Sequence, residues 1–224
     1  MNLRIGRVFP GLRALALAGV LSLLAMGLAV PALAAPTVYG PTGLILVPTA
    51  DVLPNGGLNF ALHRFGGEND LTFNLSVLEN LEFGVTARSW DEGHGSDALA
   101  NLKFRLLNET RQGPAVAVGV TDLTDDYGRD AYVVVTKSLP EVGFRGTIGI
   151  SGDGLLAGLS KELNPVSVSR SGRAGAPGTT FLLELDHNAL NVGLGIGLTP
   201  QFRANVYLYD LHTPILGVSY QARF

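Results

Sequence analysis

Glu184 and Asp186 stand two residues apart in a stretch where apolar and polar residues alternate. On a strand, their carboxylates would share one face, an arrangement that could supply a general acid and a general base. The structural alternative is that each carboxylate pairs with Arg or Lys across the lumen of a narrow barrel. We favour pairing, because it is the usual way to keep charge inside such a barrel.

A hydrolase with a serine, a histidine and an acid at the rim of a barrel is the second chemical hypothesis. The side chains that could approach such a rim are His63, Thr72, Arg88, Ser89, His94 and His212. Only His63 has a clear inward position, and none of the six lies in a recognisable local motif. The sequence therefore predicts no catalytic residue and a protein that is not an enzyme, with His63 as the residue to mutate in testing the alternative.

No cofactor and no metal site is predicted. The chain has no cysteine, which excludes disulfides, thiolate nucleophiles and cysteine-ligated zinc. Its four histidines are scattered, without the close spacing of a metal site. Gly193, Gly195 and Gly197 have the wrong spacing for a dinucleotide-binding loop. We interpret these three glycines as a strand face kept small where the lumen is crowded.

The composition excludes several classes of protein. Charged residues make up 16% of the 224 residues, against about 25% in typical proteins, and 46% of residues are hydrophobic. The 16 Lys and Arg residues are outnumbered by 19 Asp and Glu residues. A disordered chain, a module with nucleic acid as its partner and a polybasic membrane-surface binder are therefore excluded.

Residues 1–34 have the pattern of a signal peptide. Three arginines precede an apolar run over 14–30, and a proline ends that run. Ala32 and Ala34 then match the small-x-small cleavage pattern, which predicts a mature chain beginning at Ala35. The alternative interpretation is an uncleaved membrane anchor, because the apolar run is long for a signal peptide.

From Gly57 onward the dominant period is two, which is typical of strands with two unlike faces. The pattern predicts an all-β fold, a closed antiparallel transmembrane β-barrel over 57–224, because most of the apolar-polar segments have the length of a tilted membrane-spanning strand. We expect twelve strands, with ten as the alternative. The expected ranges are 57–64, 70–78, 81–89, 98–107, 114–122, 130–138, 142–151, 154–162, 178–186, 189–198, 201–210 and 214–224.

The polar face of these strands carries charges that a soluble sandwich would simply turn toward water. In a barrel they would face a wet or ion-paired lumen, with the apolar face in contact with lipid. We therefore predict a structural network of lumen charges, paired across strands. Its members are Glu82, Arg88, Lys103, Arg105, Arg145, Glu184, Asp186 and Arg203.

The last strand alternates up to Phe224, with Tyr220 on the same apolar face. Such an ending resembles the C-terminal signal of bacterial outer-membrane barrels, so outer-membrane lipid and the barrel-assembly machinery are expected partners. One feature does not fit this pattern. The polar stretch 163–177 is long, although it falls at the end of the barrel where short connections are expected. It is either a periplasmic insertion or a sign that a strand nearby has been miscounted.

Residues 35–56 precede the barrel and contain four prolines, which argue against a regular central strand. We expect an extended segment or a plug in the lumen. Residues 40–56 read Gly-x-x-Gly-Leu-Ile-x-x-Pro-Thr-Ala-x-Val-Leu-Pro-x-Gly, which resembles the opening of the YjbH-like family of outer-membrane proteins. Later blocks of that family are similar to 101–105, 132–137 and 183–193.

The resemblance implies a barrel and an association with exopolysaccharide production or export, with polysaccharide or export components as partners. The match has two departures. Long members of the family greatly exceed this length, and Glu184-Leu185-Asp186 stands where the family has Glu-Tyr-Asp. We expect a non-enzymatic outer-membrane barrel linked to exopolysaccharide or envelope biogenesis. A passive small-solute pore is the alternative, and an outer-membrane hydrolase is the less favoured one.

Overall fold

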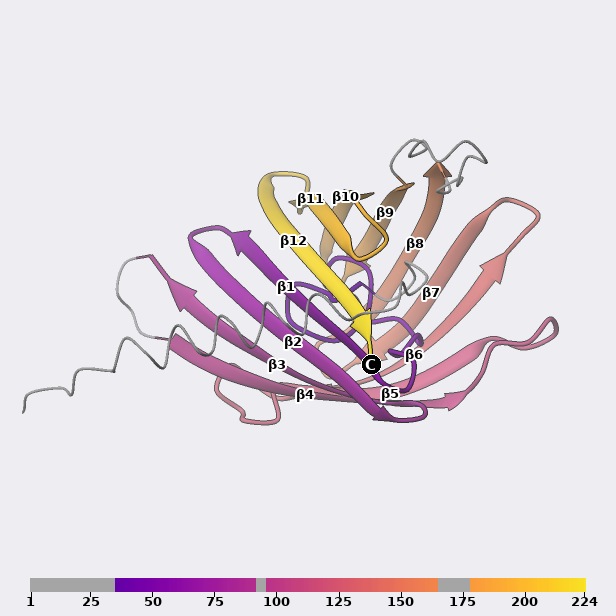
Figure 1. Ribbon diagram of the computed structural model, residues 1–224, viewed down its shortest axis with the longest axis horizontal. Coiled ribbons are helices and arrows are strands. Elements are labelled where there is room, and N and C mark those ends of the chain that lie inside the picture. Colours follow the sequence, from indigo (N-terminus) through magenta and orange to yellow (C-terminus); the bar gives the residue numbers. More distant parts are fainter. Residues whose placement is uncertain (1–34, 92–95, 165–177) are drawn as a thin grey trace, which may run out of the picture.

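The computed structural model describes residues 35–91, 96–164 and 178–224, which form a closed antiparallel β-barrel of twelve strands (Figure 1). Each strand pairs with its neighbours in the sequence, and β1 closes the barrel against β12, with Gly57 opposite Arg223. The strands are β1 Gly57–Phe65, β2 Glu68–Leu78, β3 Leu81–Trp90, β4 Ser96–Leu107, β5 Ala115–Thr121, β6 Asp130–Leu139, β7 Phe144–Ser151, β8 Leu155–Asn164, β9 Gly178–Asp186, β10 Ala189–Gly197, β11 Phe202–Tyr209 and β12 Thr213–Arg223.

The barrel confirms the expected fold and the count of twelve strands, and the alternative of ten strands is wrong. Each expected range overlaps one observed strand, and β9 has the expected bounds. The expected range for β2 starts two residues late, because the turn before it is only Gly66-Gly67. Both glycines adopt positive φ angles, 56° and 93°, so two residues suffice to reverse the chain.

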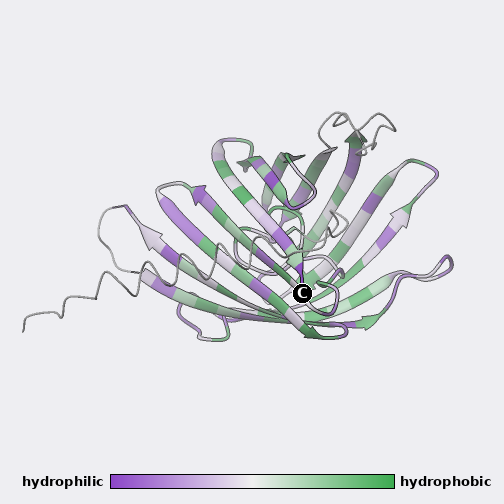
Figure 2. Ribbon diagram, viewed as in Figure 1, coloured by the Kyte–Doolittle hydropathy of each residue, from purple (hydrophilic) through white to green (hydrophobic). Residues whose placement is uncertain are grey.

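The two faces of the sheet differ in polarity, and the colours alternate along most strands in Figure 2. Large apolar side chains such as Leu71, Phe83 and Ile148 lie exposed on the outside, with Ile148 64% accessible. Polar side chains at the intervening positions, such as Asn59 and Thr72, are fully buried on the inside. The alternation of side chains along a strand thus places polar groups in the lumen. Among the described residues, no helix is long and apolar enough to cross a membrane.

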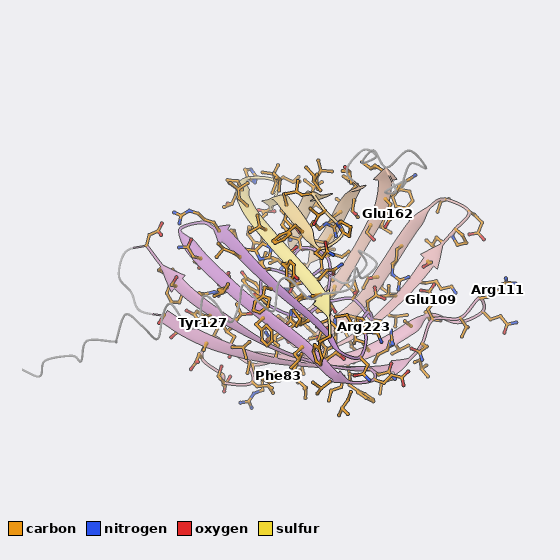
Figure 3. The ribbon with its side chains drawn as sticks, viewed as in Figure 1. Phe83, Glu109, Arg111, Tyr127, Glu162 and Arg223 are labelled. Atoms are coloured by element: carbon orange, nitrogen blue, oxygen red, sulfur yellow. The ribbon has the colours of Figure 1, made fainter. Side chains whose placement is uncertain are left out.

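The two ends of the barrel carry different connections. We call the end with Gly57 and Arg223 the terminal end, and the opposite end the far end. The connection 108–114 lies at the terminal end and the connection 122–129 at the far end, so Arg111 and Tyr127 lie far apart in Figure 3. Residues 165–177 lie outside the described residues, but β8 ends and β9 begins at the terminal end. The unusual position expected for 163–177 therefore does not come from a miscounted strand.

Residues 35–56 lie inside the barrel, where Figure 1 shows them as indigo loops. We call them the lumen segment. Its apolar side chains form much of the buried core, with Val38, Ile45 and Val47 fully inaccessible. The segment folds back on itself through two isolated bridges, Pro36 with Thr42 and Gly43 with Pro48. The segment thus occupies the lumen, and it has an irregular backbone.

Candidate functional site: an occupied lumen

Glu82 on β3 holds the two ends of a bend in the lumen segment. Its carboxylate accepts hydrogen bonds from Thr42 N at 2.7 Å, from Thr42 Oγ1 at 2.8 Å and from Leu53 N at 3.0 Å. Lys103 on β4 lies 3.6 Å from Glu82 and donates to the carbonyl oxygen of Thr42 at 2.7 Å. All of these groups are buried. Glu82 and Lys103 therefore neutralise each other's charge and also bind the lumen segment.

Glu184 on β9 makes the second anchor. Its carboxylate accepts hydrogen bonds from three successive backbone N–H groups, Ile45 at 2.9 Å, Leu46 at 2.8 Å and Val47 at 3.2 Å. Asn191 on β10 donates a fourth at 2.9 Å. The expectation that Glu184 pairs with Arg or Lys is therefore wrong. Its negative charge is stabilised by oriented amides, which act as fixed positive dipoles.

Neutral side chains of the wall complete the attachment. Asn74 donates to the carbonyl oxygen of Gly40 at 2.6 Å, and Asn101 donates to that of Tyr39 at 3.0 Å. On β6, Thr136 accepts from the N–H group of Ala50 at 2.8 Å. An irregular segment cannot satisfy its own backbone groups, and a buried unpaired group is costly. The polar wall supplies the missing partners.

Arg145 on β7 connects the lumen segment to a connection at the terminal end. Its guanidinium lies 2.7 Å from Asp51 of the segment and 2.6 Å from Glu109. Glu109 also accepts from the N–H group of Ser138 at 2.7 Å. Burial alone would raise the pKa of Glu109, but the hydrogen bonds from Ser138 and the nearby Arg145 charge outweigh it and lower the pKa.

Arg88 on β3 lies near the far end, in a second charged cluster. It lies 2.8 Å from Asp70 and 3.5 Å from Glu68, both on β2. Its guanidinium also lies over the rings of Tyr39 and Tyr127, 4.5 Å and 5.0 Å from their centroids. Arg88 thus contacts both the lumen segment and the connection 122–129. The sequence predicted that Arg88 faces inward, but it did not reveal these two contacts.

The remaining charges of the predicted network do not pair across strands with opposite charges. Arg105 donates to the amide oxygen of Asn80 at 3.0 Å and 2.8 Å. Arg203 has no ion pair within 4.0 Å among the described residues, and its guanidinium lies against Gly195. Asp186 lies 3.2 Å from its chain neighbour His187. The eight residues therefore form separate clusters, most of them organised around the lumen segment, instead of one network.

Two glycines of β10 keep the lumen wall clear for large side chains. A Cβ atom on Gly193 would overlap the ring of Tyr207, and one on Gly195 would overlap the guanidinium of Arg203. Gly197 differs, since the first atom that a Cβ there would meet is the carbonyl oxygen of Gly178 at 3.4 Å. The crowded-lumen interpretation is confirmed for Gly193 and Gly195 only.

The residues considered for a hydrolase do not assemble into one. His63 is fully buried against Tyr207, and neither of its ring nitrogens has a hydrogen-bond partner among the described residues. Ser89 Oγ donates to a backbone carbonyl, that of Asn69, at 3.5 Å. Thr72 contacts Thr86 and the lumen segment. His212 lies exposed at the far end, and His94 lies outside the described residues.

A serine, a histidine and an aspartate do meet at the far end, in a combination that the sequence did not indicate. Ser151 Oγ lies 3.0 Å from His187 Nε2, and His187 Nδ1 lies 3.2 Å from Asp186 Oδ1. Asp130 and Asp153 lie beside them, close enough to His187 for the three to hold a metal ion. Asp130, Asp153 and His187 belong to three separate hairpins, so no local spacing could have revealed their meeting.

The lumen segment separates two cavities. The far-end cavity has a volume of about 230 Å³ and includes Tyr39, Leu46 and His187 in its wall. The terminal-end cavity has a volume of about 320 Å³ and includes Leu44, Asp51 and Arg145. Leu44 and Leu46, two residues apart in the segment, thus line opposite cavities.

A closed antiparallel barrel with an apolar outer face and a polar lumen defines this chain as a porin-like β-barrel. A solved structure of similar fold is the KdgM porin, with a TM-score of 0.51 at 9% identity, covering 73% of this chain and 98% of that chain. The outer-membrane protein Omp33 of Acinetobacter baumannii has a TM-score of 0.46 at 9% identity, covering 75% and 97%.

The family is identified from the sequence. The model of the YjbH family, described as "Exopolysaccharide biosynthesis protein YbjH", matches residues 36–180, which include all but the first residue of the lumen segment and strands β1 to β8. The chain belongs to this family, as the resemblance of residues 40–56 implied. Among proteins of curated function, none matches the sequence significantly.

Proposed function

We propose that this protein is an outer-membrane barrel with a plugged lumen that serves exopolysaccharide production or export and catalyses no reaction itself. The occupied lumen is the observation that carries the proposal. The lumen segment contributes fully buried core residues, and it is held by the carboxylates of Glu82 and Glu184. Membership of a family described by exopolysaccharide biosynthesis supports the biological context.

The outer face supports a position in the outer membrane. Phe60 packs on Phe73 with ring centroids 4.8 Å apart, and Tyr220 packs on Phe202 at 4.9 Å. These rings lie on neighbouring strands β11, β12, β1 and β2, because Phe60 and Tyr220 are register partners. Rows of aromatic side chains are typical of barrels at a membrane interface. In this proposal the terminal end faces the periplasm and the far end faces the outside.

A passive pore for small solutes is the second candidate, and the similarity of the fold to the KdgM porin favours it. The two functions differ in what the lumen segment does. A constitutive pore would conduct with the segment in place, whereas a plugged barrel opens only when the segment moves. The division of the lumen into two cavities supports the plugged state.

The test is single-channel conductance of the refolded protein in planar bilayers. We expect the protein from Ala35 onward to be closed for most of the time, and a variant lacking residues 36–56 to conduct steadily. Because the chain has no cysteine, a disulfide between A50C and T136C can lock the segment to the wall. The locked protein should stay closed until it is reduced. Steady conductance of the unaltered and the locked protein would contradict the plugged state.

The link to exopolysaccharide needs a separate assay in cells. We expect a strain without the gene to secrete less polysaccharide, and the unaltered protein to restore secretion. The disulfide-locked variant, present at equal level in the outer membrane, should fail to restore it until a reductant is added. Unchanged secretion without the gene, together with slower uptake of small solutes, would support the passive pore instead.

A further inference from the structure

Two carboxylates and an imidazole from three separate hairpins converge at the far end of the barrel. Asp130 is the first residue of β6, Asp153 lies in the turn between β7 and β8, and His187 lies in the turn between β9 and β10. One possible ligand atom of each side chain lies within 4.8 Å of the others. A single ion could therefore contact all three residues without a large rearrangement of the backbone.

The local structure orients these groups. The N–H group of Gly152 donates to one oxygen of Asp130 at 2.7 Å, which fixes that carboxylate on the β7–β8 turn. Asp186 lies 3.2 Å from His187 Nδ1, and a proton on Nδ1 leaves the lone pair on Nε2. A carboxylate behind the far nitrogen of a histidine is the arrangement that orients histidines as metal ligands. Nε2 lies 3.0 Å from the hydroxyl of Ser151.

No Lys or Arg side chain in the described part of the chain pairs with the carboxylates of this cluster. Asp130, Asp153 and Asp186 have no ion pair with Lys or Arg within 4.0 Å among the residues that the structure describes. Three carboxylates around one imidazole repel one another, and a bound cation would remove that repulsion.

A cavity lies beside the cluster. Asp130, Asp153 and His187 all line the far-end cavity of about 230 Å³. A metal ion with three protein ligands retains water molecules, and the cavity gives them room.

The same residues fit a nucleophilic triad less well. Ser151, His187 and Asp186 have the right order, but the N–H groups next to Ser151 are already engaged. That of Gly152 donates to Asp130, and that of Asp153 donates to Ser151 Oγ at 3.2 Å. A developing oxyanion needs free donors, and the surrounding carboxylates would repel it. The cluster suits a cation.

We infer that Asp130, Asp153 and His187 form a binding site for a divalent transition-metal ion, with Asp186 as a positioning residue behind His187. Two carboxylates and an imidazole favour Zn²⁺ or Mn²⁺ over Ca²⁺ and Mg²⁺, which prefer oxygen ligands alone. The bound ion would link the start of β6 to the β7–β8 and β9–β10 turns, and so would stiffen the wall of the far-end cavity.

The test is calorimetric titration of the folded protein, prepared without a histidine tag and treated with EDTA, with Zn²⁺, Mn²⁺, Ca²⁺ and Mg²⁺ in turn. We expect one Zn²⁺ or Mn²⁺ per barrel and a higher thermal unfolding midpoint with the ion. D153N and H187Q should each weaken Zn²⁺ binding at least tenfold, and D186N by about 10- to 100-fold. Asp153 is exposed, so D153N tests the site even if D130N fails to fold.

Two control variants give the test its specificity. H212Q removes an exposed histidine at the same end of the barrel, and E141Q removes an exposed carboxylate at the opposite end. Both should bind Zn²⁺ as the unaltered protein does. Equal loss in H212Q, no binding of any of the four ions, or tighter binding of Ca²⁺ than of Zn²⁺ that H187Q leaves unchanged would each overturn the inference.

Discussion

Replacement of Glu184 by glutamine tests whether the lumen segment is held by charge. The substitution keeps the shape of the side chain but replaces one carboxylate oxygen by an NH₂ group. Each oxygen of Glu184 accepts two hydrogen bonds, Leu46 N and Asn191 Nδ2 on one, Ile45 N and Val47 N on the other. Glutamine can therefore accept only two of the four, and its NH₂ group faces two donors.

The expected magnitude follows from the number of bonds lost. A hydrogen bond to a charged group contributes about 1.5–3 kcal/mol, so losing two costs about 3–6 kcal/mol. Even the lower figure raises the fraction of detached segment about a hundredfold. The barrel strands keep their own hydrogen bonds, so we expect the segment to loosen while the barrel stays folded.

Cysteine labelling measures this detachment. Val47 is fully buried and the chain has no cysteine, so V47C provides one reporter that a maleimide reaches only when the segment leaves the wall. In this background E184Q should be labelled about a hundred times faster, with unchanged gel mobility of the folded barrel. The matched control is E141Q, in the exposed connection 140–143. Equal labelling rates in the two variants would refute the idea that Glu184 anchors the segment.

Two further predictions concern the wall and the far end. G193V should overpack the lumen against the ring of Tyr207 and lower the free energy of unfolding by about 1–3 kcal/mol, whereas G197V should have little effect on urea unfolding in detergent. Asp122 begins the connection 122–129; burial opposes its ionisation, but hydrogen bonds from Thr124 and from backbone N–H groups outweigh burial and lower its pKa. The ionised form therefore stabilises the connection above about pH 4, and that contribution is lost as the pH falls further. Trp90 is the one tryptophan, and its ring centroid lies 5.7 Å from that of Tyr127 in this connection. The tryptophan fluorescence should therefore change below pH 4 in the unaltered protein, and it should already be changed at neutral pH in D122N. An identical acid transition in both proteins would contradict the role of Asp122.

Much of the fold could be predicted from the sequence, because a strand in a barrel wall has only two faces. Alternation placed Glu82, Lys103 and Glu184 inside and Leu71 and Phe83 outside, as the structure has them. The strand ends were less certain. The pattern at 70–78 omitted Glu68 and Asn69, since the alternation does not show where a two-glycine turn ends.

The partners of the lumen charges could not be predicted from position alone. The alternation of side chains along the strand shows that Glu184 faces inward. The backbone N–H groups that it binds belong to Ile45 to Val47, more than 130 residues earlier in the chain. The far-end cluster was missed for the same reason, because Asp130, Asp153 and His187 meet only after three hairpins are placed side by side.

The irregular backbone of the lumen segment explains why the wall carries buried carboxylates. A regular strand would satisfy its N–H groups through neighbours, but residues 42–53 expose several of them to the interior. A carboxylate oxygen accepts two or more hydrogen bonds, so Glu82 and Glu184 satisfy six backbone and side-chain donors of the segment between them. Without the segment, the same carboxylates would lie in a water-filled lumen. The positions of Glu82 and Glu184 are therefore explained by the hydrogen bonds that they accept from the lumen segment. A protein selected only to conduct would not need carboxylates at these two positions.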